Sequence, residues 1–75
     1  MQRFFFDLVD CNTAEFDYRG REMRSAEQAR QMAEVIAIDE STRGDRIGWR
    51  VRVSDAAGTT YFVIPVIELP ELTVA

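Results

Sequence analysis

The sequence predicts an α+β fold in the order ββαββ: a four-stranded, mainly antiparallel sheet with one helix packed on one face, giving two layers. Two strand-like stretches of alternating apolar and polar residues precede one long segment with helical periodicity, and two more follow it. Turn-forming residues separate the members of each pair, as is typical of hairpins. Because 75 residues suffice for one core only, we predict a single domain over residues 1–75.

An aromatic stretch opens the chain. Residues 3–10 alternate between two faces, with Phe4 and Phe6 on the same face, which predicts the first strand. Small and polar residues follow and suit a turn. The alternation resumes over residues 14–19 and ends at Gly20, so we predict a second strand that returns beside the first.

A capping box marks the start of the helix. The Ser25 hydroxyl can accept from the amide of Gln28, whose side chain can reach back to the serine amide. Small and apolar residues then recur at spacings of three and four. Gly44 suits a left-handed C-cap. The sequence therefore predicts a helix over residues 26–43, with a narrow alanine-rich stripe that allows close packing on the sheet.

The second hairpin follows the helix. Residues 47–54 alternate and predict the third strand, and a turn from Asp55 to Gly58 follows it. The fourth predicted strand, residues 59–68, is apolar at almost every central position, so both of its faces need cover. Pro65 lies within it and favours an edge position, because proline lacks the N–H that a central strand needs.

The order and spacing of these features resemble a family of short bacterial domains of unknown function. The resemblance covers nearly the whole chain, although Cys11 stands where the family commonly has glycine. It implies the fold described above and implies no activity, cofactor or catalytic residue. The residues that carry it are Phe4 to Asp10, Asp17, Gly20, Glu22, Ala26, Ala29, Ala33, Val53, Asp55 and Gly58.

Charge and composition exclude several classes of protein. The chain has no histidine and one cysteine, so it can build neither a histidine-dependent nucleophile nor an internal disulfide. Its net charge of −4 argues against a nucleic-acid surface. Asp7 interrupts the first apolar stretch too early for a secretory signal. We therefore expect a cytoplasmic protein with no membrane association, no enzymatic activity, no catalytic residues, no cofactor and no metal.

Surplus apolar surface is the most informative feature of the sequence. One helix can cover one face of the sheet, and large apolar residues remain on the other. The leading hypothesis is a protein-association module, in its simplest form a homodimer joined through the helix-free face or the edge of the last strand. Alternatively, arginine stems and a C-terminal segment through Leu69 and Leu72 cover that face. The candidate interface residues are Phe5, Val9, Tyr61, Val63, Ile64 and Ile67.

The residues leave two other functions open. A sheet that binds single-stranded nucleic acid would use Arg50 and Arg52 with the rings of Phe5 and Tyr61. A cation site or carboxylate enzyme would use the acidic first hairpin. Its candidate residues are Asp7, Asp10, Glu15, Asp17 and Glu22.

Overall fold

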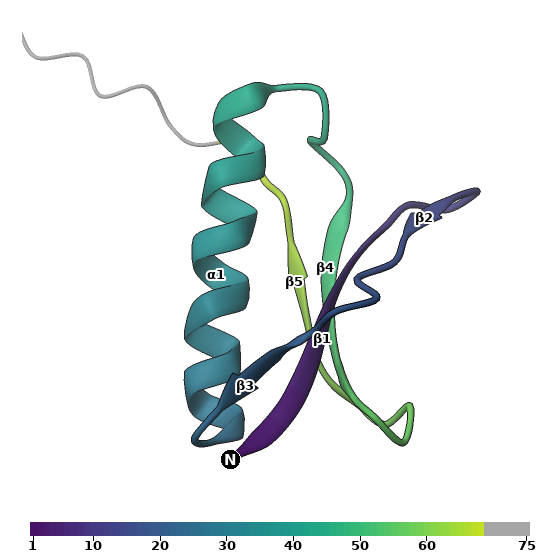
Figure 1. Ribbon diagram of the computed structural model, residues 1–75. Coiled ribbons are helices and arrows are strands. Elements are labelled where there is room, and N and C mark those ends of the chain that lie inside the picture. Colours follow the sequence, from purple (N-terminus) through teal and green to yellow (C-terminus); the bar gives the residue numbers. More distant parts are fainter. Residues whose placement is uncertain (69–75) are drawn as a thin grey trace, which may run out of the picture.

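A computed structural model describes residues 1–68 and has one helix, α1 (Ala26–Arg43), packed along one face of an antiparallel sheet (Figure 1). The strands are β1 (Gln2–Val9), β2 (Ala14–Glu15), β3 (Arg21–Met23), β4 (Arg50–Asp55) and β5 (Thr60–Pro65). The predicted α+β class, with one helix on one face of the sheet, is confirmed.

The sheet has the strand order β2-β1-β4-β5, and β3 pairs with β1 on the same side as β2. All pairings are antiparallel. β1 and β4 form the centre, with Phe4 opposite Asp55 and Val9 opposite Arg50. The sheet therefore has two different edges: β5 alone forms one, and β2 and β3 share the other.

The helix has the predicted bounds and caps. Ser25 Oγ accepts from the amide of Gln28 at 3.1 Å, and Gly44 adopts a left-handed φ of 82°. The second half of the capping box differs from the prediction: Gln28 Oε1 accepts from the amide of Arg24 at 2.7 Å, one residue before the cap. Both arrangements satisfy an amide at the helix start.

The core lies between α1 and the facing side of the sheet. The buried apolar residues that α1 contributes to this core are all alanines. Because the alanine side chain is short, the helix lies close to the strands. Phe4, Val51 and Val53 are fully buried beneath it. The remaining buried apolar residues are Phe6, Met23, Ala29, Ala33, Ala37 and Val66.

The second predicted strand, residues 14–19, is wrong in extent. Only Ala14–Glu15 pairs with β1 there, and the chain rejoins β1 as β3, which the alternation did not predict. Between β2 and β3, the Asp17 carboxylate accepts a hydrogen bond from the amide of Phe6, in place of a backbone carbonyl. Phe16, which follows β2, is consequently exposed.

The second hairpin needs smaller corrections. β4 begins at Arg50 rather than at 47, because the amide of Trp49 donates to the carbonyl of Arg46 in a turn. β5 occupies residues 60–65 of the predicted 59–68. The proposed cover by Leu69 and Leu72 lies outside the described residues. Within residues 1–68, no helix has the length and apolarity needed to cross a membrane.

Candidate functional site

The outer side of β5 has unused backbone groups. The amide of Val66 donates to Trp49 O at 2.8 Å, and its carbonyl accepts from Gly48 N at 3.0 Å, so the backbone of residue 66 faces the β4 side. Backbone groups alternate along a strand, so those of Ile64 also face β4, whereas those of Val63 and Pro65 face outward. No strand within residues 1–68 pairs with this outer side. We call it the open edge.

Apolar side chains surround the open edge. Val63, on the helix-free face, is 50% exposed, and Ile67 beyond the strand is also exposed. On the helix side a groove of about 320 Å³ lies between α1 and β5. We call it the edge groove. Its lining residues are Glu34, Ala37, Ile38, Ser41, Ile64, Pro65 and Ile67.

The surface around the open edge has little charge. β5 reads Thr-Tyr-Phe-Val-Ile-Pro and contains no acidic or basic residue. Among residues 1–68, Glu34 is the one charged residue that lines the edge groove, and it lies 3.6 Å from Arg30 in an ion pair. β5 itself thus carries none of the charge of a chain whose net charge is −4.

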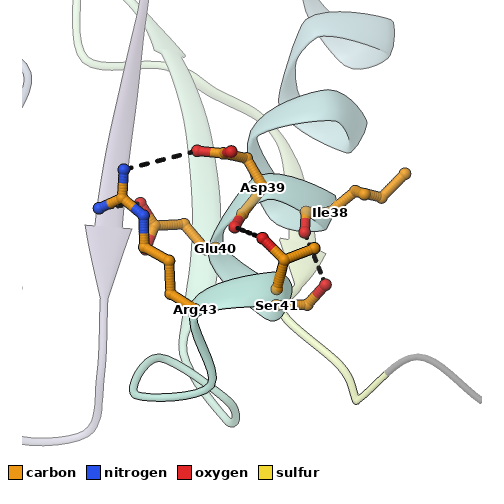
Figure 2. A network of polar contacts seen from close by, with 6 residues as sticks. Ile38, Asp39, Glu40, Ser41 and Arg43 are labelled. Carbon is orange, nitrogen blue, oxygen red and sulfur yellow. Dashed lines mark hydrogen bonds and ion pairs between the residues drawn. The ribbon is translucent and has the colours of Figure 1, made fainter. Parts of the chain in front are cut away.

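The last turn of α1 separates charged from apolar side chains (Figure 2). The Arg43 guanidinium lies 3.7 Å from Asp39 and 3.9 Å from the buried Glu40. Ile38 points away from Arg43 in this view and lines the edge groove. The charged groups of this turn therefore lie together, with Arg43 shared between two carboxylates, while Ile38 keeps an apolar side chain on the groove side of the helix.

The centre of the helix-free face is polar. Asp7 lies opposite Arg52, and Arg52 Nη2 donates to Asp7 Oδ2 at 2.9 Å. Asp7 is 5% exposed, whereas the Arg52 side chain is 36% exposed, so only the acidic partner of this ion pair is withdrawn from water. Phe5 and Val9 flank it and are half-buried. The exposed apolar surface is therefore greater at the β5 side than at the centre of this face.

The six predicted interface residues do not share one face. Phe5, Val9 and Val63 lie on the helix-free face, since their register partners are Ser54, Arg50 and Arg52. Ile64 and Ile67 instead line the edge groove. Three of the six, Val63, Ile64 and Ile67, therefore meet around the open edge.

Tyr61 lies apart from the other predicted interface residues. A register shift between Val53 and Ser54 leaves it as the extra residue of a bulge in β5. Its ring packs edge-on against the buried Phe4, with centroids 5.4 Å apart. Its hydroxyl donates to Asp55 Oδ2 at 3.1 Å. A simple alternation cannot predict this, because a bulge changes the face at one position.

Asp55 organises the turn that precedes the bulge. Oδ1 accepts from the amides of Ala57 at 2.9 Å and Thr59 at 3.0 Å. The hydrogen bond from Thr59 and those from Tyr61, Ala57 and Gly58 hold the pKa of Asp55 below its usual 3.8. These hydrogen bonds explain why an aspartate begins the turn from Asp55 to Gly58.

The side of β1 away from β4 is closed instead of open. The amide of Phe6 lies in the gap between β2 and β3, and the Asp17 carboxylate accepts from it at 3.2 Å. Oδ1 of Asp17 also accepts from Arg19 N at 3.1 Å and Gly20 N at 3.0 Å. The Asp17 amide donates to Asp7 at 2.9 Å. A side chain thus supplies the acceptor for the Phe6 amide where no strand is present.

Gly20 allows this closed edge to approach β1. Its φ is 69°, and a Cβ built there would lie 2.8 Å from the carbonyl oxygen of Phe4. Only glycine fits both the left-handed conformation and the space. The spacing of Asp17 and Gly20 was visible in the sequence, but their joint role depends on β1 lying beside them.

Arg46 fixes the far end of the closed edge. It forms an ion pair with Glu15 of β2, and its guanidinium lies 4.5 Å from the centre of the Trp49 ring. The hydrogen bond to Glu15 raises the pKa of Arg46 above its usual value, so the charge is retained. This contact links β2 to the loop after α1.

The alternative sites are not assembled. The proposed nucleic-acid platform is divided, because Arg52 is paired with Asp7 and Tyr61 packs on Phe4, on the helix side of the sheet. Asp7 and Asp17 accept hydrogen bonds from the chain itself, and Glu15 and Glu22 pair with Arg46 and Arg3. Among residues 1–68, no three Asp, Glu or Cys side chains are grouped so that they could hold a metal ion.

The fold and site define a small α+β domain with one covered sheet face, one closed edge and one open edge. A family model matches residues 3–68, and its description is a domain of unknown function, DUF6894. The chain therefore belongs to this family, whose fold the resemblance implied. No curated protein and no solved structure matches the chain significantly.

Proposed function

We propose that this domain is a protein-association module that forms a homodimer through the open edge of β5. One observation carries the proposal: a strand edge that no other strand of residues 1–68 pairs with adjoins exposed apolar side chains on both faces of the sheet. Uncovered edges of this kind bind further strands, because their backbone groups are already arranged for pairing. The ion pair at the centre of the helix-free face favours the edge over the face.

A small chain benefits from this association. At 75 residues, the domain buries a smaller fraction of its surface than larger domains do, and so has little stability to spare. Pairing at β5 would extend the sheet and cover Val63, Ile67 and the edge groove at once. The contact is isologous, so one surface serves both copies and the assembly closes at two.

Sedimentation equilibrium over a wide concentration range tests the proposal. We expect wild type to approach twice the mass of 8.6 kDa as concentration rises. Val63→Glu places like charges at the seam and should leave a folded monomer. The matched control is Phe16→Glu on the closed edge, because Phe16 is 53% exposed and Val63 is 50% exposed. It should keep the wild-type mass profile.

A wild-type monomer at every concentration contradicts the proposal. So does a Val63→Glu variant that retains the helical circular dichroism signal of wild type and still dimerises. A dimer lost equally in both variants would place the contact elsewhere.

A further inference from the structure

We infer that the partner strand at the open edge is β5 of a second copy, antiparallel and centred on Val63, with the two edge grooves meeting at the seam. This inference rests on the proposed homodimer and specifies its register and its second apolar contact. The backbone groups that the edge offers decide between the registers.

Pro65 restricts the possible registers. Of the outward-facing residues, Val63 offers both an N–H and a C=O, whereas Pro65 has no N–H. If the two-fold axis passes Val63, the two copies of Val63 exchange both hydrogen bonds. If the axis passes Ile64 instead, Val63 lies opposite Pro65 and its carbonyl finds no donor. The register on Val63 is therefore the more fully satisfied.

The bulge fits the same register. With Val63 opposite Val63, Pro65 of one copy lies opposite Tyr61 of the other. Tyr61 is the extra residue of the bulge, where the regular ladder already ends. Proline and bulge thus meet outside the paired centre, and pairing is confined to a short stretch instead of continuing into a larger assembly.

Charge and symmetry both favour a second copy as the occupant. β5 has no charged residue, so pairing two copies of this strand places no like charges opposite one another, and the Glu34 that lines each groove is paired with Arg30 of its own helix. A two-fold axis normal to the sheet places both helices on the same face. Because each edge groove lies between α1 and β5, the two grooves then adjoin across the seam.

Disulfide cross-linking tests the register. Facing residues of a hydrogen-bonded antiparallel pair have Cα atoms about 5.5 Å apart, within the range of about 4.4–6.8 Å that a disulfide spans. The single natural cysteine is removed with Cys11→Ser. Under mild oxidation in this background, Val63→Cys should become a covalent dimer on a non-reducing gel. Phe16→Cys, of similar exposure, should remain largely uncrosslinked.

The contact between the grooves is tested on the helix. Ile38→Glu should weaken the dimer on the order of tenfold or more in sedimentation. Val35→Glu is the matched control, because Val35 is 59% exposed on the same helix, close to the 52% of Ile38, but does not line the groove. It should leave the dissociation constant within about twofold of wild type.

The outcomes separate the two proposals. A monomeric wild type overturns the homodimer itself. A dimer in which Val9→Cys on the helix-free face cross-links and Val63→Cys does not overturns the register while leaving self-association standing. A dimer that tolerates Ile38→Glu as well as Val35→Glu overturns the contact between the grooves.

Discussion

The two edges of this sheet differ in what happens to their outward-facing backbone groups. On the β1 side, two short strands pair with β1, and the Asp17 carboxylate accepts from the amide of Phe6 between them. On the β5 side, the strand keeps its outward backbone groups and has exposed apolar neighbours. Proteins usually block both edges against unwanted pairing. A domain that uses specific side chains to close one edge and leaves the other apolar has one surface suited to binding.

The largest expected effect comes from a substitution that disrupts the closed edge. Gly20→Ala brings a Cβ against the Phe4 carbonyl and puts alanine at a φ of 69°. Strain and overpacking together should lower the free energy of unfolding by about 3 kcal/mol, measured by urea denaturation. Gly44→Ala is the control, since its φ is 82° but a built Cβ meets no residue within 4 Å beyond its chain neighbours in the described part of the chain. It should cost about 1 kcal/mol. Equal losses in the two variants would refute the close approach.

Removing the bridging carboxylate has the next largest effect. Asp17→Ala leaves the amide of Phe6 without its acceptor and frees two further amides, which should cost about 2 kcal/mol in urea denaturation. Glu22→Ala removes a carboxylate from the same edge, where its ion pair with Arg3 spans 3.7 Å and is exposed. That control should cost less than about 0.5 kcal/mol. An Asp17→Ala variant as stable as Glu22→Ala would mean that the edge is not held by Asp17.

The smallest effect concerns the turn beside the bulge at the open edge. Hydrogen bonds lower the pKa of Asp55 in the folded state, so its contribution to stability is present above pH 3.8 and is lost as the pH falls through the lowered value. Asp55→Asn cannot titrate. The stability difference between wild type and Asp55→Asn should therefore shrink between about pH 5 and pH 2, measured by urea midpoints. A difference independent of pH would contradict the lowered pKa.

Local signals in the sequence predicted the bounds of the helix correctly and the edges of the sheet only in part. Ser25 and Gly44 determine where α1 begins and ends through contacts within a few residues, so its bounds were readable. The alternation of Phe4 and Phe6 likewise placed the core face of β1. The interruption of strand pairing at Asp17 could not be predicted, because the Asp17 side chain binds the amide of Phe6 in another strand.

In the candidate site, too, local features were predicted and contacts between distant residues were not. Pro65 indicated an edge strand, and the apolar run around it indicated uncovered surface, because both signals are local to β5. The edge groove was missed because Ile38 belongs to the helix and Ile64 to the strand, and only their packing places them together. Tyr61 was misplaced because a single-residue bulge moves it to the helix side, against Phe4.

Amide hydrogen exchange at Phe6 and Val63 tests the contrast between the edges most directly. The Phe6 amide donates to Asp17 within one chain, so its protection should be the same at all protein concentrations. The outward Val63 amide should exchange rapidly in dilute protein and become protected as concentration rises, because in the proposed dimer its acceptor belongs to the second copy. Rapid exchange of Val63 at every concentration, or a Phe6 amide as unprotected as Val63, would contradict the assignment of one closed and one open edge.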